Sequence, residues 1–454
     1  MSTNQDSGQA EVIDLNKKSY KGSIDVLKTP QPHSLPVTMA SSPTKVIIVG
    51  CGVAGPVLAC ILKSKGFRPV VYERIKRDSD GGISLMLQSN GLRVLALIPG
   101  LLEQLPGQVE NHMAFYSTVP GHEELLGEYT LETPLDTVGT MNNSVNSVGM
   151  GIRRHDFLHV LSGTATKAGV EIHYEHKVID VQQEADIVHV KFENGTTDTA
   201  SFVVGCDGIH SNTRISLFGK EEASYTGLTQ LGGFSPSPKS WSHKNAMVNY
   251  FGEETHMISY QIGPDLNSWA ITRREAEHKE TWRAVDDSIL EELKKDPVSK
   301  WGFGAGELVQ TAKKMIKYGL YDRPELKTWH KGRVILIGDA AHPTSPHLGQ
   351  GANQALEDVY HLVRVLLKHS PSVGEPSMGA LKDAFEEFES IRLPRTSSLV
   401  KQARQTGEKT RVIKGTAACL ARNEAIRAIW ENPKVSVQSL ANARSGPFEG
   451  ESEI

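Results

Sequence analysis

KVIIVGCGVAG, residues 45–55, contains a G-x-G-x-x-G turn between a strand pattern and a helix pattern. Val46–Val49 is an apolar, β-branched run that predicts a buried strand ending at the turn. In such a turn Gly50 makes the tight bend, Gly52 lets the backbone approach a pyrophosphate, and Gly55 allows close packing of helix against strand. The sequence therefore predicts a dinucleotide-binding site here.

The next predicted strand, Val70–Tyr72, ends at Glu73, which lies twenty-one residues beyond Gly52. A carboxylate at this spacing is placed to accept hydrogen bonds from a ribose, and it repels a 2′-phosphate. The first site therefore favours FAD or NAD over NADP. Cys51 is interpreted as a small side chain that fits the turn.

A second strand–turn–helix pattern occupies Val334–Asp358. Its apolar strand ends at Gly338, Asp339 follows at once, and a helix is predicted to begin after a glycine turn at Gly349–Gly351. Backbone N–H groups at a helix start favour an electron-rich ligand, and the carboxylate beside them can accept from hydroxyl groups. A strand, a glycine turn and a helix in this order are also common where they serve only as structural framework.

Two further stretches place polar side chains at the ends of predicted strands or helices. Asp207, in the turn Gly205–Gly208, can accept a hydrogen bond from a ribityl hydroxyl, although a structural salt bridge with Arg214 would explain it equally well. Arg154 precedes a predicted helix and can pair with a phosphate or with a surface carboxylate.

Composition restricts the class of protein. The chain has 454 residues, 39% of them hydrophobic, which is enough for two or three domains with cores. The net charge of −4, from 49 basic and 53 acidic residues, argues against nucleic acid as a partner. The four cysteines show no ligand-like spacing, so we expect reduced thiols and no metal. Without a long apolar run or a signal-peptide pattern, we expect a soluble, cytoplasmic protein with no membrane anchor.

Three motifs in a fixed order resemble a known family. The G-x-G-x-x-G turn with Glu73, then Gly205–Gly208 with Ser211 and Arg214, and then Gly338–Pro343 are similar to motifs of the FAD-dependent aromatic-ring hydroxylases. These single-component flavin monooxygenases include para-hydroxybenzoate hydroxylase and salicylate hydroxylase. The resemblance implies an α/β fold: a doubly wound, Rossmann-like FAD-binding domain interrupted by a mostly antiparallel β-sheet substrate domain, with C-terminal helices.

The resemblance also assigns roles to single residues. Arg154 belongs to an Arg-x-Asp-Phe pattern that contacts the flavin cofactor in such proteins, and Asp339 is expected at the ribityl or pyrophosphate part of FAD. Gly351 and Ala352 are expected to offer N–H groups near the isoalloxazine, and Gly82 to lie against the adenosine half. His342 could form a hydrolase-like triad with Ser345 and Asp339 on paper, but the two prolines of this loop do not fix such a geometry.

The predicted domains follow from the same motif order. Between Leu101 and Met150 the pattern is irregular, which favours a loop-rich insertion or part of the second domain. The predicted segments are a flexible N-terminal arm at 1–43, a discontinuous FAD-binding domain at 44–115, 150–220 and 325–400, a substrate domain at 116–149 and 221–324, and a helical C-terminal tail at 401–454.

Alternating residues predict three strands of the substrate domain, at 246–251, 256–261 and 268–272. Tyr250 and Tyr260 lie on these strands and are candidates for facing the substrate, although an aromatic residue on a strand more often belongs to the core.

The predicted substrate domain differs from the family at one position. The family pattern that begins at Tyr225 would place an arginine where this chain has Gly232. With no basic cluster evident in residues 224–317 and many apolar side chains there, we expect a bulky, weakly charged natural product as the substrate.

The resemblance implies a mechanism. NAD(P)H would reduce FAD, O2 would add to the reduced flavin, and the C4a-hydroperoxide would hydroxylate or epoxidise an electron-rich aromatic, indole-like or alkene substrate, in secondary-metabolite biosynthesis. No second G-x-G-x-x-G unit is present for the nicotinamide. The alternatives are a flavin-dependent oxidase or reductase without oxygen transfer, and a non-catalytic flavin-binding protein. We expect a monomer or a homodimer.

Overall fold

The computed structural model describes residues 43–77, 82–130, 149–241, 244–277, 287–371, 374–431, 444–448 and 450–454. The predicted N-terminal arm, apart from Pro43, lies outside the described residues.

A six-stranded sheet forms the centre of the part predicted to bind the dinucleotide. Its inner pairs are parallel, with Ile47 opposite Val70 on one side and Val203 on the other, and only the short edge strand β18 runs antiparallel. These strands are apolar on both faces because helices cover both sides of a parallel sheet. The order across the sheet is β18 (His330–Lys331), β19 (Val334–Leu336), β12 (Phe202–Gly205), β1 (Lys45–Val49), β2 (Arg68–Tyr72) and β8 (Glu171–His173).

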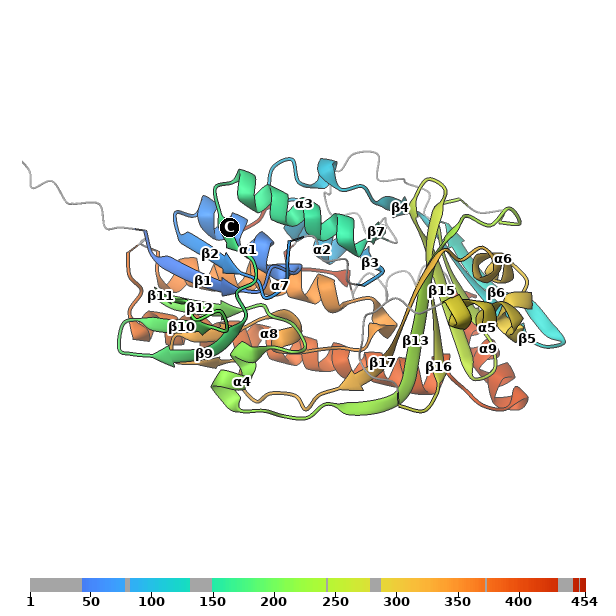
Figure 1. The fold of residues 1–454 in the computed structure, drawn as a ribbon. Helices are drawn as coiled ribbons and strands as arrows, with labels where there is room; N and C mark the ends of the chain where they lie inside the picture. Colours follow the sequence, from blue (N-terminus) through green and yellow to red (C-terminus); the bar gives the residue numbers. More distant parts are fainter. Residues whose placement is uncertain are drawn as a thin grey trace, which may run out of the picture. The chain divides into compact units, whose positions relative to one another are not determined.

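Helices and small sheets surround this core (Figure 1). Helix α1 packs against both α3 and α7, and α7 packs along α8. The helices are α1 (Ala54–Ser64), α2 (Ser89–Leu95), α3 (Arg154–Lys167), α4 (Asn212–Phe218), α7 (Gly351–His369) and α8 (Met378–Thr406). The small sheets are β11-β10-β9 (Thr197–Ala200, Val188–Phe192, Val178–Gln183) and β3-β7-β4 (Ser84–Leu87, Gly149–Arg153, Gln108–Glu110).

The second large sheet has seven strands and is antiparallel except for the β14–β5 pair. The three predicted strands are present as β14, β15 and β16, and the sheet carries α5 (Asp287–Lys295), α6 (Ala305–Gln310) and α9 (Thr416–Trp430) beside it (Figure 1). Its order is β17 (Lys314–Asp322), β13 (Ser224–Pro236), β16 (Leu266–Arg274), β15 (Thr255–Gly263), β14 (Ala246–Phe251), β5 (His112–Val119) and β6 (His122–Thr130).

The region predicted as irregular, Leu101–Met150, contains regular structure. Strands β5 and β6 form a hairpin around Pro120 and Gly121, and β5 joins the seven-stranded sheet through a parallel pairing with β14. Of the two alternatives for this stretch, its described strands agree with part of the second domain. The pattern looks irregular because the burial of β5 does not alternate residue by residue, so the period-two signal is weak. We propose to place the domain boundary before His112, since a boundary at 116 would divide β5.

Helix α8 continues through Pro394. A turn of π-helix, Gly407–Arg411, follows directly and leads the chain toward the seven-stranded sheet. None of the helices in the described ranges combines the length and hydropathy that crossing a membrane requires.

Candidate functional site

The glycine turn after β1 has the close contacts that its sequence predicts. Gly50 has a φ of +108°, and a Cβ there would lie 2.5 Å from the carbonyl oxygen of Cys206 on the turn after β12. A Cβ on Gly55 would lie 2.0 Å from the Gly50 carbonyl oxygen, whereas a Cβ on Gly52 would meet open space. Gly50 and Gly55 therefore permit close packing, and Gly52 leaves room for a ligand.

Glu73 stands at the end of β2 and is fixed by the same turn. Its Oε2 accepts a hydrogen bond from the Cys51 N–H at 2.7 Å, and its Oε1 accepts from the Ile75 N–H at 3.0 Å. The carboxylate is therefore held at the mouth of the turn, where it was expected to receive ribose hydroxyls.

Arg154, the first residue of α3, lies beside Gly82, where a Cβ would be 2.7 Å from the Arg154 Cδ. Burial lowers the pKa of Arg154, and the negative charges of Asp339 and Glu73 partly offset this. One guanidinium thus lies close to two predicted cofactor-binding carboxylates from different strands. No wider side chain than glycine fits at position 82 without moving Arg154.

Asp207 forms its own small network rather than a salt bridge. Its carboxylate accepts from Ser211 Oγ at 2.5 Å and from the Thr213 N–H and Oγ1 at 3.0 Å each. Arg214 instead donates to Glu221 Oε2 at 2.6 Å. The alternative of an Asp207–Arg214 pair is therefore wrong, because the turn into α4 directs the two side chains to different partners.

The loop after β19 brings Asp339 to the start of α7. A Cβ on Gly351 would lie 3.8 Å from Asp339 Oδ1, so the carboxylate faces the unsatisfied N–H groups of the first helical turn. His342 Nε2 donates to the ionised carboxylate of Asp358 at Oδ2, 2.6 Å away, and does not bond to Asp339. With His342 bound to Asp358, a hydrolase-like triad does not form.

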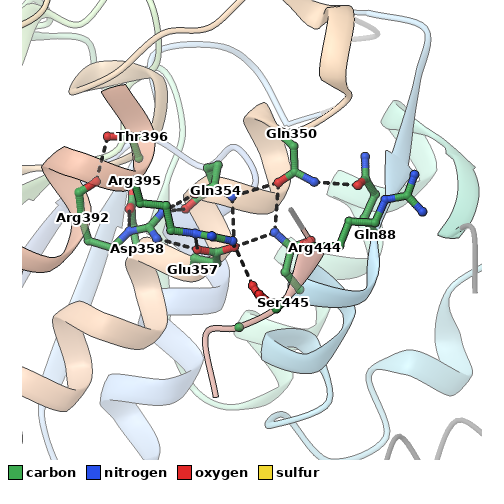
Figure 2. Close-up of polar contacts among 12 residues, drawn as sticks. Gln88, Gln350, Gln354, Glu357, Asp358, Arg392, Arg395, Thr396, Arg444 and Ser445 are labelled. Atoms are coloured by element: carbon green, nitrogen blue, oxygen red, sulfur yellow. Dashed lines mark hydrogen bonds and ion pairs between the residues drawn. The ribbon is translucent and has the colours of Figure 1, made fainter. Parts of the chain in front are cut away.

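A buried network of ion pairs and hydrogen bonds between α8 and α7 supports the same loop (Figure 2). Arg392 of α8 donates through Nε to Asp358 Oδ1 at 2.7 Å and through Nη1 to Glu357 Oε2, and its Nη2 donates to Gln354 Oε1 at 2.6 Å. Gln354 donates in turn to Gln350 at 2.8 Å. The first turn of α7 is therefore held by glutamine hydrogen bonds that connect to paired charged side chains.

The network also reaches the loop before α7. Gln350 Nε2 donates to Gln88 Oε1 at 2.6 Å, and Gln88 Nε2 donates to the carbonyl oxygens of Leu348 and Gly349 at 3.1 and 3.2 Å (Figure 2 shows the Gln350–Gln88 contact). The backbone that leads to Gly351 and Ala352 is thus held in one conformation.

One cavity of about 1300 Å³ connects the two large sheets. It extends from the glycine turn to side chains of β5, β14, β15 and β16. Of the residues predicted to bind the cofactor, all except Gly55, which packs the helix against the strand, line this cavity: Gly50, Gly52, Glu73, Gly82, Arg154, Asp207, Asp339, Gly351 and Ala352.

Residues 43–402 match the FAD binding domain family, which is most of the chain. The chain belongs to this family. It is an FAD-dependent monooxygenase related to the aromatic hydroxylases.

Two curated relatives are similar over most of their length. The chain is 29% identical over 399 residues to the 3-amino-4-hydroxybenzoate 2-monooxygenase of Streptomyces cremeus, covering 86% of this chain and 93% of the relative. It is 28% identical over 342 residues to the 6-hydroxynicotinate 3-monooxygenase of Pseudomonas fluorescens, covering 72% and 83%. The fold matches the crystal structure of Klebsiella pneumoniae HpxO complexed with FAD and uric acid, with a TM-score of 0.73 at 21% identity, covering 89% of this chain and 97% of that one.

The cavity of this monooxygenase fits FAD by its own features. Space is open above Gly52, Asp339 is exposed to the cavity, and the N–H groups of the first turn of α7 face the same space. These backbone donors and carboxylate acceptors suit an organic dinucleotide. Among the described residues, no group of three or more His, Cys, Asp or Glu could hold a metal ion.

The two candidate tyrosines of the monooxygenase lie in different surroundings. Tyr260 lines the cavity, and its hydroxyl is 2.7 Å from Ser84 Oγ, which is itself 2.6 Å from Ser268 Oγ. Tyr250 does not face the cavity: it is fully buried, and its hydroxyl donates to the Phe303 carbonyl oxygen at 2.9 Å. Tyr250 is a core residue because α6 and the loop before it cover that face of the sheet.

A further polar pair on the cavity wall was missed in the sequence. Tyr318 of β17 donates to Gln230 Oε1, and Gln230 Nε2 donates to Thr272 Oγ1 at 3.3 Å. Burial raises the pKa of Tyr318 above its ordinary value, so its hydroxyl keeps its proton. Only the antiparallel pairing of β13 with β17 and β16 brings these side chains together, and no local motif announces it.

Arg411 was also missed, because the sequence places it in a C-terminal tail. The π-helical turn after α8 carries it to the cavity wall, close to the loop at His347 and to the seven-stranded sheet. At position 232, where the family pattern has an arginine, a Cβ would lie 2.3 Å from Ile83 Cδ1. Ile83 thus occupies the space that the Cβ of any larger residue at position 232 would need.

Proposed function

We propose that this monooxygenase uses NAD(P)H and O2 to hydroxylate or epoxidise an electron-rich aromatic, indole-like or alkene substrate in secondary metabolism. One observation carries the proposal: the cavity that holds the predicted FAD residues continues, without a wall between, to the apolar and aromatic side chains of the antiparallel sheet. A cofactor and an apolar ring can therefore meet in one continuous cavity.

The predicted FAD residues divide into two groups by position. Glu73 at the end of β2 would hold the ribose of the adenosine half, and Gly52 with Arg154 would receive the pyrophosphate. Asp339 would accept from the ribityl chain. Bound FAD would supply the redox chemistry, accepting electrons from NAD(P)H and activating O2.

The N–H groups of Gly351 and Ala352 would stabilise negative charge that develops on the flavin ring. They belong to the first turn of a nineteen-residue helix, and no carboxylate is present in that turn. The positive end of the helix dipole therefore points into the cavity, held in place by the Gln350–Gln354 contacts.

Tyr260 is the side chain we propose to orient the substrate through its hydroxyl. Burial raises its pKa to about 12, so the proton stays on the phenol near neutral pH. Since either oxygen of the Tyr260–Ser84 pair can donate, the pair can turn a hydrogen bond toward a substrate oxygen or accept one from a hydroxyl group.

The relatives named above act on 3-amino-4-hydroxybenzoate and 6-hydroxynicotinate, which are electron-rich aromatic rings. Their names support a ring as the substrate here, and the apolar part of the cavity, with Met113, Phe115 and Trp430, leaves room for a larger one. Hydroxylation is the form of oxygen transfer that these relatives' names support.

Purified protein with FAD should oxidise NAD(P)H and consume O2 when a substrate is added, and the product should be heavier by one oxygen atom. An oxidase or reductase would consume the cofactor and form hydrogen peroxide with no heavier product. A non-catalytic flavin-binding protein would bind FAD and consume neither. Mass spectrometry with isotope-labelled O2 separates these outcomes.

Asp339→Ala tests the cofactor site directly. Loss of this carboxylate removes an acceptor next to the α7 helix start, so we expect the variant to purify with at least about tenfold less bound flavin than the parent. Absorbance of the purified protein measures it.

Asp180→Ala, on β9 and away from the cavity, is the matched control and should keep its yellow colour. Normal flavin content in Asp339→Ala would contradict the role given to Asp339.

A further inference from the structure

Arg411 lies on the wall of the cavity at the end of a π-helical turn, a rare conformation that is often found at functional sites. Three other lining residues connect to it: His347 accepts from Arg411 through its carbonyl oxygen, and Asn249 and Phe251 contact His256, which Arg411 also meets. Two of them belong to β14, in the sheet proposed to cover the substrate. His347 belongs to the loop that leads to Gly351.

In the part of the chain that the structure describes, the guanidinium of Arg411 has only uncharged partners. Its Nη2 donates to the His347 carbonyl oxygen at 2.6 Å, and its Nη1 lies 3.2 and 3.4 Å from the two ring nitrogens of His256. Burial, with the positive charge of Arg411 next in weight, lowers the pKa of His256 well below its ordinary value, so this imidazole is neutral. Among the described residues, no carboxylate lies within ion-pair distance of Arg411.

A positive charge in this position is unfavourable without an anion. Burial lowers the pKa of Arg411 to about 10, so the side chain is still protonated at neutral pH. A charge removed from water without a counter-ion destabilises a protein, and such charges are normally paired. The cavity side of Arg411 is where an anion can reach it.

His347 provides a second, independent observation. Its side chain is 4% exposed, it borders the same cavity, and its Nδ1 has no hydrogen-bond partner among the described residues. Burial, followed by the charge of Arg411, lowers the pKa of His347 to about 3. A neutral imidazole with an unsatisfied nitrogen next to a guanidinium can share the same polar ligand.

We propose that Arg411 binds a carboxylate of the substrate, with His347 beside it, so that the substrate is an apolar ring system carrying one acidic group. The planar guanidinium matches the geometry of a carboxylate, to which it can donate two parallel hydrogen bonds. This inference rests on the proposed function and names the substrate class of the same cavity. It replaces the expectation of a weakly charged substrate, since the cationic group comes from outside residues 224–317.

The experiment compares aromatic acids with their uncharged amides on the FAD-loaded protein. The probes are salicylate against salicylamide and an indole carboxylate against its carboxamide, titrated at constant ionic strength with the flavin absorbance as the readout. We expect an acid to bind about tenfold or more tightly than its amide. In Arg411→Met the two should bind within about threefold of each other, and Arg411→Lys should keep part of the difference.

The matched control is Arg422→Met. Arg422 is an arginine of the same C-terminal segment, buried where Arg411 is half-buried, and it donates to the carbonyl oxygens of Gly252 and Phe251 without bordering the cavity. It should keep the preference for the acid. Flavin content and the KM for NADH and NADPH should be unchanged in Arg411→Met, since a fall in either would assign Arg411 to a cofactor phosphate and overturn the inference.

Three other results would overturn it: an amide that binds as tightly as its acid, a preference for the acid that survives in Arg411→Met, or no binding by any acid of the panel. Each of these leaves the proposed function standing if the protein holds FAD and transfers oxygen. Flavin-free protein would instead contradict the proposed function itself.

Discussion

Arg392, which is buried, and Arg411, which is half-buried on the cavity wall, both belong to the long helical segment that begins at Met378. Arg392 is fully buried and meets the carboxylates of Glu357 and Asp358 (Figure 2). Arg411, within the described ranges, meets only a carbonyl oxygen and a neutral imidazole. A charge that is paired within the protein fixes the structure, whereas a charge left unpaired on a cavity wall is available to a ligand.

The carboxylates of the two regions show the same contrast. Burial alone would raise the pKa of Asp358, but His342 and Arg392 lower it below its ordinary value, so it is ionised. Near Arg411 the titratable neighbours, His256 and His347, are both kept neutral by burial. The first region therefore needs no ligand for charge balance.

The largest change in stability is expected from a substitution in the region where the charges are paired. Arg392→Met leaves the carboxylates of Glu357 and Asp358 buried with fewer partners, and breaking a buried pair in this way costs about 3–5 kcal/mol of stability. Urea unfolding of the FAD-loaded protein measures it. Because the network supports the loop before Gly351, flavin content should fall as well. A variant as stable as the parent would show that the network does not fix this part of the fold.

Glu110 is a buried acid with no cationic partner among the described residues. Its substitution should give the next largest change in stability. It accepts from the Gln261 N–H at 2.7 Å, its Oε2 has no partner among the described residues, and burial raises its pKa from 4.5 to about 8. In the unfolded chain it ionises near its ordinary value, so ionisation destabilises the fold progressively between pH 4.5 and 8.

Glu110→Gln should therefore leave stability unchanged below pH 4.5 and raise it by roughly 2–4 kcal/mol at pH 8 and above. Chemical unfolding of parent and variant across this range gives the difference. A constant difference at all pH values would mean that the fold does not hold Glu110 protonated.

The smallest effect on stability is expected at Arg411. Arg411→Met removes a charge that has no counter-ion, so the free energy of unfolding should change by less than about 1 kcal/mol or increase. The measurement is the same urea titration in the absence of substrate. A loss as large as that of Arg392→Met would remove the contrast between the two arginines and assign Arg411 a structural role.

The dinucleotide half could be predicted because its signals are local. The turn at Gly50–Gly55 and the acid at Glu73 lie within thirty residues of each other, and strand, turn and helix each leave their own period in that stretch. The family resemblance then gave the mixed architecture. The roles of single residues toward FAD stay predictions.

The substrate side could be predicted only in part because its contacts join distant segments. Strand β5 pairs in parallel with β14, more than one hundred residues later, and its burial does not alternate. Tyr250 and Tyr260 have the same pattern in sequence, yet only Tyr260 reaches the cavity. Arg411 meets His256, which lies 155 residues earlier, and no local periodicity can predict such a contact.

Helix α8 and the π-helical turn that directly follows it form one continuous helical segment, which carries both arginines. An α-helix turns by about 100° for each residue, so one residue inserted between Arg395 and Gly407 would rotate the guanidinium of Arg411 away from the cavity while leaving the ionic network in place. The number of residues in this segment, as much as their identity, therefore determines whether Arg411 adds its charge to this part of the cavity wall.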